Sequence, residues 1–163
     1  MRAGGVRRMN GHERHEKHER VSLDLGIFSE REEMEKGSLS DRVLACAVKV
    51  HKKLGPGFLE KVYENALMIE LRKDGLFAEQ QKGVPVYYEG EIVGDFVADI
   101  IVENKLIIEL KAVSAFCGEH AACCMNYLRA TNHPVCLLLN FGKTTLQIKR
   151  FVGESYIDSP ETI

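Results

Sequence analysis

Between residues 38 and 152 the hydrophobic positions alternate between helical and strand-like spacing. A helical stripe begins after Ser38-Leu39-Ser40-Asp41, a segment typical of a helix N-cap, and is broken at Leu54-Gly55-Pro56-Gly57. Apolar residues three and four apart predict a second helix over residues 58–72 and a third over 118–131. The chain therefore begins its folded part with two helices and returns to helix once more.

Strand-like patterns fill the remaining segments. Residues 92–102 and 106–113 are rich in β-branched residues and predict a hairpin. Residues 135–140 are continuously apolar and predict a buried, central strand. Shorter strands are predicted over 77–82, 84–88 and 146–152. The order α-α-β-β-β-β-α-β-β predicts an α/β fold, a mixed sheet with helices on its faces.

The predicted hairpin carries three charged residues inside its apolar runs, Asp99, Glu109 and Lys111. Glu109 and Lys111 are two residues apart, so on a strand they point to the same face. If the loop consists of residues 103–105, Asp99 lies opposite Glu109. A two-residue turn would instead put the two carboxylates on opposite faces of the sheet.

Two opposed carboxylates repel each other, and burying them among apolar residues costs several kcal/mol more. A divalent cation such as Mg²⁺ would convert this repulsion into ligation, and Lys111 beside it could position a water or stabilise negative charge. The alternative is a plain hairpin on which these residues are solvated surface charges. Glu60, in the first turn of the second predicted helix, is most simply explained as a complement to the helix dipole.

The chain has 163 residues, enough for one domain with a single core. Its hydrophobic content of 45%, charged content of 28% and net charge of −2 are typical of a soluble globular protein and exclude a polycation. No apolar run approaches the ~20 residues that span a bilayer, and the N-terminus lacks the apolar region of a secretory signal. We expect a cytoplasmic protein.

Residues 1–37 differ from the rest in being polar and repetitive. They include the three-residue repeat of residues 12–20, in which His and Glu precede Arg or Lys, and they hold eight basic and eight acidic residues. Because these charges cancel, the segment is not a basic nucleic-acid arm. It is expected to be disordered or a loosely attached helix; an alternative is that translation starts later, for instance at Met34. Residues 153–163 are expected to form a frayed C-terminal tail.

The five cysteines are odd in number and include no CxxC pair, so free thiols are expected. Cys117, His120 and Cys124 could share one helical face and bind a soft metal. The simpler explanation is that such cysteines are small buried apolar residues.

Two motifs carry a resemblance to a known family. Asp99 followed by Glu109-Leu110-Lys111 resembles the core of the PD-(D/E)XK nuclease superfamily, with Ala98 in place of the proline. The segment Gly57-Phe58-Leu59-Glu60-Lys61-Val62-Tyr63 resembles the signature of the GxxExxY proteins, which are usually placed in that superfamily. Further similarity extends over residues 38–152, at Tyr88, Gly94, Asn126-Tyr127-Leu128, Asn140-Phe141-Gly142 and Lys149-Arg150.

The resemblance implies a restriction-endonuclease-like fold and a Mg²⁺ or Mn²⁺ site. It implies that Asp99 and Glu109 are metal ligands, that Lys111 is the catalytic lysine and that Glu60 is a third carboxylate, which binds the metal or accepts a proton from the water. Where the family often has a glutamine that orients the lysine or a ligand, this chain has Cys123.

The expected function is therefore metal-dependent hydrolysis of phosphodiester bonds in DNA or RNA. The alternatives are a nucleic-acid-binding module that keeps the fold without turnover, and a protein-interaction role as a homodimer. The intact carboxylates and lysine favour the nuclease. Four basic residues are expected to contact phosphates, namely Lys61, Arg129, Lys149 and Arg150.

Overall fold

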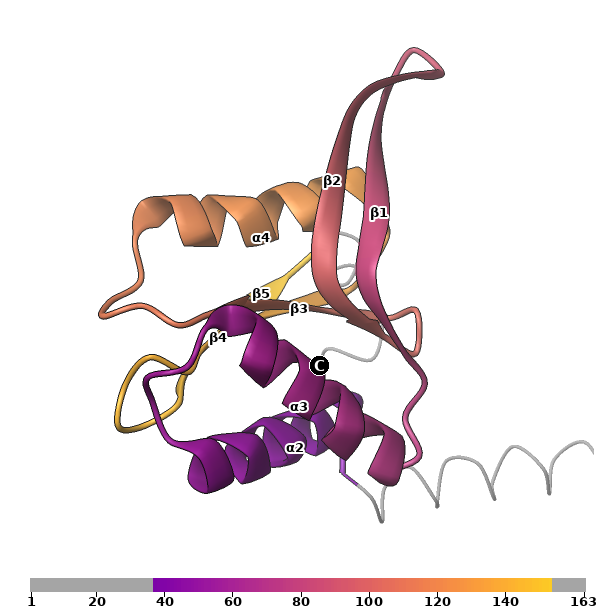
Figure 1. Cartoon of the computed structure of the whole chain (residues 1–163). Coiled ribbons are helices and arrows are strands. Elements are labelled where there is room, and N and C mark those ends of the chain that lie inside the picture. The colour runs from indigo at the N-terminus through magenta and orange to yellow at the C-terminus, as the bar shows by residue number, and fades with distance from the viewer. Residues whose placement is uncertain (1–36, 154–163) are drawn as a thin grey trace, which may run out of the picture. The chain divides into compact units, whose positions relative to one another are not determined.

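The computed structural model describes residues 37–153 (Figure 1). The chain divides into two compact units between Ser38 and Leu39. We describe the unit that begins at Leu39 by itself. The tails predicted for residues 1–37 and 153–163 lie outside the described residues, apart from Gly37 and Gly153.

Three helices and five strands follow one another in the described residues. Their order is α2 (Leu39–Leu54), α3 (Glu60–Lys73), β1 (Ala78–Tyr88), β2 (Glu91–Val102), β3 (Leu106–Lys111), α4 (Gly118–Ala130), β4 (Val135–Asn140) and β5 (Gln147–Val152). The predicted α/β class and the order of helical and strand segments are confirmed. One detail differs, because a single strand, β1 (Ala78–Tyr88), takes the place of the two strands predicted over residues 77–82 and 84–88. Pro85 does not break β1, since β1 is an edge strand and tolerates a missing N–H.

The strands form one mixed sheet in the order β1-β2-β3-β4-β5. The β3–β4 pair is parallel and the other pairs are antiparallel, so α4 serves as the crossover that a parallel pair requires. Side chains of β3 alternate between two cores, with Ile108 packing on the side of α2 and α3 and Ile107 on the side of α4. The sheet thus separates α2 and α3 from α4 (Figure 1), and β4 is buried along its whole length, as predicted.

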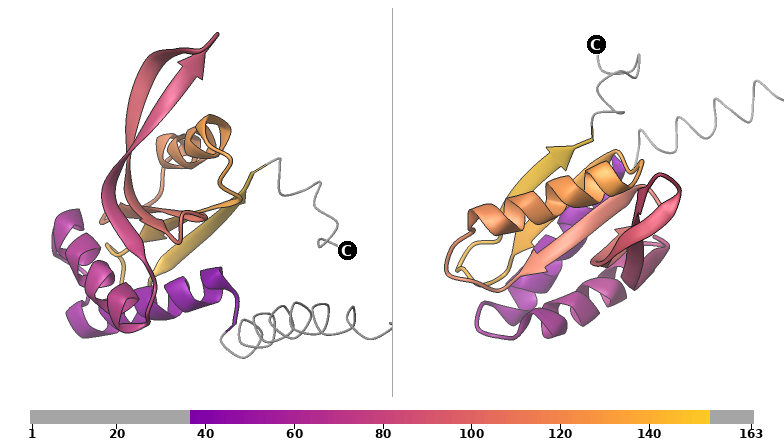
Figure 2. Two further views of the ribbon diagram at one scale, coloured as in Figure 1. Left: turned by 90° about the vertical axis from the view of Figure 1, so that its right-hand side faces the viewer. Right: turned by 90° about the horizontal axis from the view of Figure 1, so that it is seen from above.

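The β2–β3 hairpin has the three-residue loop, because Val102 pairs with Leu106. Glu103 and Asn104 both have a φ of 51°, in the left-handed region that residues other than glycine seldom adopt. The β2–β3 pairing ends at Ile100 and Ile108. Beyond this point β2 continues with β1 as a two-stranded ribbon that leaves the sheet (Figures 1 and 2). We call the place where β2 leaves β3 the fork.

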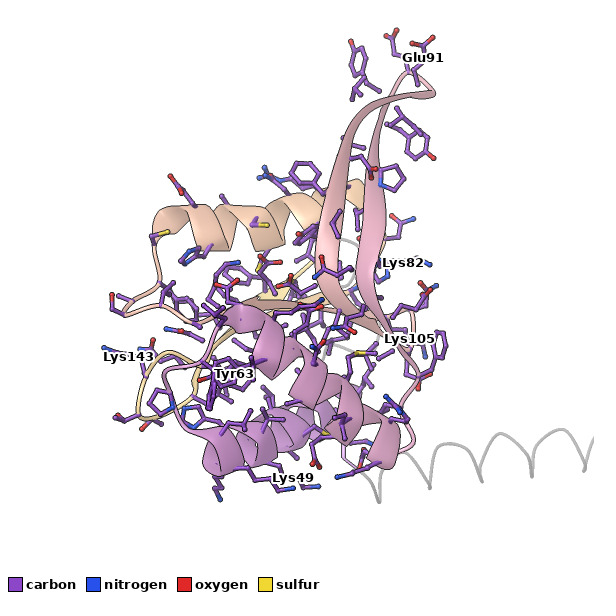
Figure 3. All side chains as sticks on the ribbon, viewed as in Figure 1. Lys49, Tyr63, Lys82, Glu91, Lys105 and Lys143 are labelled. Atoms are coloured by element: carbon purple, nitrogen blue, oxygen red, sulfur yellow. The ribbon has the colours of Figure 1, made fainter. Side chains whose placement is uncertain are left out.

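The start of α3 is fixed by a loop that follows α2. Gly55 has a φ of +67°, which favours glycine. The hydroxyl of Tyr63 donates to the Gly55 carbonyl oxygen at 2.7 Å and accepts from the Phe58 N–H at 3.1 Å. The Tyr63 ring (labelled in Figure 3) stacks on Phe141, with 4.7 Å between ring centroids. These contacts hold the first turns of α3 in one position relative to the sheet.

No helix among residues 37–153 is long and apolar enough to cross a membrane. All five cysteines are free thiols, as predicted.

Candidate active site

The fork leaves backbone N–H groups at the end of β3 without partners in β2, and carboxylates from other elements accept from them. The Leu110 N–H donates to Asp99 Oδ2 at 2.7 Å, and the Ala112 N–H donates to Glu60 Oε1 at 3.3 Å. The divergence of the two strands therefore draws Asp99 of β2 and Glu60 of α3 to the same end of β3.

Glu109 and Lys111 lie side by side at this end, on the α4 side of the sheet. Lys111 Nζ donates to Glu109 Oε1 at 2.7 Å, and the side chains are 18% and 7% exposed, respectively. The second oxygen, Glu109 Oε2, is buried and has no hydrogen-bond partner among the described residues. Buried acceptors are nearly always hydrogen-bonded, so this atom marks a position where a ligand is expected.

The carboxyl of Asp99 has an unusual proton affinity. Burial, followed by the charges of Glu109 and Glu64, raises its pKa, while the Leu110 N–H and Lys111 oppose the rise, and the result is a pKa of about 6. Neighbouring cations therefore do not neutralise the carboxylates at the fork. A metal ion bound there would do so.

The pKa of Lys111 is shifted in the direction that keeps it charged. Burial lowers this pKa, but the hydrogen bond and charge of Glu109, with the charges of Glu60 and Asp99, outweigh burial and raise it overall. Lys111 is therefore an ammonium group at neutral pH. It can attract a phosphate oxygen, but it is not available as a base.

The structure adds two residues that the sequence did not predict for the site, Glu64 and Gln81. Glu64 is only 4% exposed. Its Oε1 accepts from Gln81 Nε2 at 3.0 Å and from Lys61 Nζ at 3.0 Å. Gln81 Nε2 also donates to Asp99 Oδ1 at 3.3 Å. Glu64 lies four residues after Glu60 on the same helix, a spacing that could have indicated it.

Six charged residues thus form what we call the acidic cluster, and its members are Glu60, Lys61, Glu64, Asp99, Glu109 and Lys111. It holds four carboxylates against two ammonium groups. Of the predicted site residues, the structure brings together all those assigned to catalysis or metal binding.

The four predicted phosphate-binding residues lie at separate places. Lys61 belongs to the acidic cluster. Lys149 pairs with Leu138, which pairs with Glu109, so Lys149 faces the same side of the sheet as Glu109. Lys149 Nζ lies 5.5 Å from the centroid of the Phe116 ring. Of the predicted four, Lys61 contacts a carboxylate directly, and Lys149 directs its side chain to the side of the sheet that carries Glu109.

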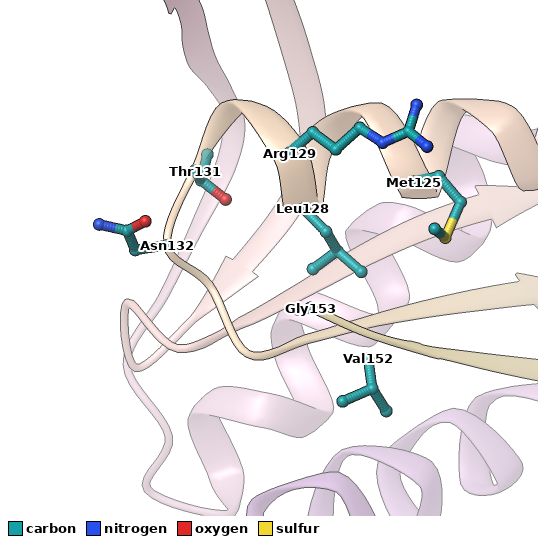
Figure 4. A pocket seen from close by; sticks show the side chains of 7 residues that line it. All are labelled: Met125, Leu128, Arg129, Thr131, Asn132, Val152 and Gly153. Atoms are coloured by element: carbon teal, nitrogen blue, oxygen red, sulfur yellow. The ribbon is translucent and has the colours of Figure 1, made fainter. Parts of the chain in front are cut away.

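The other two predicted phosphate-binding residues point elsewhere. Arg150 pairs with Leu137, whose side chain packs with the α2 and α3 core, so Arg150 faces the opposite side of the sheet from Lys149. Arg129 lines a pocket at the end of α4, together with Met125, Leu128, Thr131, Asn132, Val152 and Gly153 (Figure 4). This pocket contains no member of the acidic cluster.

The segment that follows Lys111 is held by the motif Asn140-Phe141-Gly142. The buried Asn140 amide accepts from the Val113 N–H at 3.0 Å and donates to the Val113 carbonyl at 2.9 Å. A Cβ added to Gly142 would lie 2.5 Å from the Val113 nitrogen and oxygen. This motif therefore has a structural role, because it fixes the chain directly after the predicted catalytic lysine.

Cys123 lies on α4 near the fork, at the position where the resemblance led us to expect glutamine. Burial raises the pKa of its thiol, a hydrogen bond with Tyr127 lowers it, and the charge of Glu109 raises it again. The Tyr127 hydroxyl donates to the Val97 carbonyl oxygen at 2.7 Å. Cys123 is therefore a neutral thiol that offers no amide to the site.

The soft-metal alternative is not supported. The Cys117 N–H donates to His120 Nδ1 at 3.2 Å as part of a helix cap, and Cys124 is buried in the core on the α4 side with Cys136. Within residues 37–153 no group of three or more His, Cys, Asp or Glu side chains has an arrangement that could hold a metal ion.

The fold and the site define a class: α/β domains with an acidic site where two strands of a mixed sheet diverge. A family model described as the PD-(D/E)XK nuclease superfamily matches residues 37–151. The chain belongs to this superfamily. No curated protein and no solved structure shows a significant match to the chain.

Proposed function

We propose that this protein is a divalent-metal-dependent nuclease of the GxxExxY type, which hydrolyses phosphodiester bonds in DNA or RNA. The observation that carries the proposal is Glu109 Oε2, a buried oxygen without a partner. It belongs to the same cluster as Asp99, whose pKa is raised to about 6 by burial and by neighbouring carboxylates. A structural ion pair would satisfy both oxygens of Glu109.

The chemistry of the residues present fits a divalent cation. Asp99 and Glu109 supply hard carboxylate oxygens, which Mg²⁺ and Mn²⁺ prefer. Glu60 of α3 would become a third ligand by turning from its contact with the Ala112 N–H, because in their present positions no three such side chains among residues 37–153 are arranged around one ion. The four carboxylates of the acidic cluster exceed its two ammonium groups by two charges, the charge of one such ion. When bound, the metal would lower the pKa of a water and neutralise charge on the phosphate.

Lys111 acts in this proposal as a fixed cation. Its ion pair with Glu109, at 2.7 Å, holds the ammonium beside the carboxylates, where it attracts a phosphate oxygen and stabilises the negative charge that develops during hydrolysis. Glu60 is exposed and bonded to the Ala112 N–H, so it can complete the ligand set or accept a proton from the attacking water.

The test is a cleavage assay with the full chain on single- and double-stranded DNA and RNA, with Mg²⁺, Mn²⁺ or EDTA. Lys111→Met is compared with Lys105→Met, which changes an exposed lysine at the loop of the same hairpin. We expect metal-dependent cleavage that Lys105→Met retains and Lys111→Met reduces by about 10²–10³-fold, as for loss of one group that stabilises the transition state.

Circular dichroism is used to check that both variants fold. Glu109→Gln provides a further variant, in which a charge is removed with little change of shape. Equal cleavage by wild type and Lys111→Met would indicate a contaminating nuclease. Absence of cleavage on every substrate would contradict the proposal and favour a non-catalytic nucleic-acid-binding module.

A further inference from the structure

Gln81 occupies an irregular position in β1. The β1–β2 pairs run from Gln80 with Ile100 to Lys82 with Ala98, and Gln81 lies between them with a φ of +52°. A residue with a Cβ adopts this left-handed conformation at an energetic cost. Such strained residues concentrate at functional sites, so the contacts of this side chain are of interest.

The Gln81 amide joins two carboxylates from different elements. Its Nε2 lies 3.0 Å from Glu64 Oε1 on α3 and 3.3 Å from Asp99 Oδ1 on β2. The other oxygen of Asp99 accepts from the Leu110 N–H at 2.7 Å. Both oxygens of the Asp99 carboxylate are therefore held by donors, and this fixes the plane of the group relative to Glu109.

The partner on α3 gives this contact a rigid anchor. Glu64 is 4% exposed, and its Oε1 also accepts from Lys61 Nζ at 3.0 Å. An amide carries no net charge, so Gln81 can bring Glu64 and Asp99 together without cancelling the negative charge that attracts a cation. A lysine or arginine in its place would cancel this charge.

We propose that Gln81 is a positioning residue of the nuclease site, which orients the Asp99 carboxylate for metal binding and couples it to the buried Glu64. This inference rests on the proposed function. Among the described residues, Gln81 is the side-chain donor that contacts Asp99, whereas α4 presents the thiol of Cys123 near the fork.

The test uses two variants of Gln81 that differ in backbone preference. Gln81→Leu and Gln81→Gly both remove the amide, but only glycine adopts the left-handed conformation without cost. The matched control is Gln80→Leu, since Gln80 is the preceding residue and also bonds to α3, through Asn65 Oδ1 at 2.7 Å. Mn²⁺ binding to the full-length proteins is measured by electron paramagnetic resonance, and cleavage is measured as a function of metal concentration.

We expect both Gln81 variants to bind Mn²⁺ roughly 10–100-fold more weakly than wild type, as for other residues that orient metal ligands. Both should need correspondingly more metal for half-maximal cleavage, and Gln80→Leu should behave as wild type. If only Gln81→Leu is impaired and Gln81→Gly binds normally, the amide has no positioning role and the effect is one of backbone conformation.

Normal metal binding and cleavage in both Gln81 variants would overturn the positioning role and leave the proposed function intact. If wild type itself neither binds Mn²⁺ nor cleaves any substrate, the proposed function is wrong and the positioning role is wrong with it.

Discussion

Replacing Asp99 with asparagine should stabilise the protein at neutral pH in the absence of metal ions, although it should abolish catalysis. Burial and the charges of Glu109 and Glu64 raise the pKa of Asp99 from its ordinary value of 3.8 to about 6. Asparagine has nearly the same shape and no charge, and its carbonyl oxygen can still accept from the Leu110 N–H, so only the longer contact with Gln81 Nε2, at 3.3 Å, is lost.

The size and the pH dependence follow from this shift. A carboxyl whose pKa is higher in the folded state binds its proton more tightly there, so stability falls as the pH rises from 3.8 to about 6 and stays lowered above that. A tenfold change in the ionisation equilibrium is worth about 1.4 kcal/mol, which gives about 3 kcal/mol. Because Asp99 is partly exposed to solvent, we expect about 2 kcal/mol after screening.

Urea unfolding of the full chain in EDTA measures this difference, at about pH 8, where the penalty is complete, and at about pH 4, where most of it has gone. Asp95→Asn is the control, since Asp95 is an exposed aspartate on the same strand. Asp99→Asn should raise the free energy of unfolding at the higher pH only, and Asp95→Asn should change it at neither. Addition of Mg²⁺ should stabilise wild type and have little effect on Asp99→Asn.

Two results would refute this reasoning. If Asp99→Asn is no more stable than wild type at the higher pH in EDTA, or more stable by the same amount at both pH values, the carboxylates are not in electrostatic conflict. If Mg²⁺ stabilises both proteins equally, Asp99 is not a metal ligand.

Three further predictions concern residues that support the candidate site and a lysine expected to bind nucleic acid. Tyr63→Phe removes both hydrogen bonds to the loop before α3, and should cost about 1–2 kcal/mol; an unchanged thermal midpoint would contradict this. Gly142→Ala places a Cβ 2.5 Å from backbone atoms of Val113 and should destabilise the fold by about 3 kcal/mol or more, whereas normal urea unfolding would show that this backbone can shift. Lys149→Ala should weaken nucleic-acid binding in filter-binding assays and reduce its salt dependence by about one phosphate contact. Arg150→Ala, on the opposite face of the sheet, should leave binding unchanged. Equal losses of binding in the two variants would refute the assignment of Lys149 and Arg150 to different faces.

The part of the fold that could be predicted is the part that short-range sequence patterns determine. The β-branched runs of residues 92–102 and 106–113 predict the β2–β3 hairpin. They do not predict the length of its loop, because neither the pairing of Val102 with Leu106 nor the left-handed φ of Glu103 and Asn104 can be seen in the sequence. The separation of residues 77–82 from 84–88 was wrong for a related reason. Gly83 and Pro85 commonly interrupt strands, and their acceptance in β1 depends on its position at the edge of the sheet.

Residues of the candidate site can be recognised in the sequence to the extent that they break a local pattern. Asp99, Glu109 and Lys111 interrupt apolar strands, so they are visible in the sequence. Gln81 is not, because its contact with Asp99 depends on the β1–β2 register, which sets these two residues opposite each other, and its contact with Glu64 depends on the approach of α3. Glu64 is an ordinary helical glutamate until that approach buries it.

The degree to which buried polar groups are hydrogen-bonded distinguishes the residues that support this site from the proposed metal ligands. Tyr63 and Asn140 are buried and hydrogen-bonded on both donor and acceptor atoms, as is usual in folded proteins. Glu109 keeps an unpaired buried oxygen, and Asp99 is held among other carboxylates. These hydrogen-bonded residues can impose the unfavourable arrangement because their own polar groups are satisfied, and the proposed cation would make the arrangement favourable. The same electrostatic conflict therefore predicts both the stabilisation by Asp99→Asn without metal and the loss of function that accompanies it.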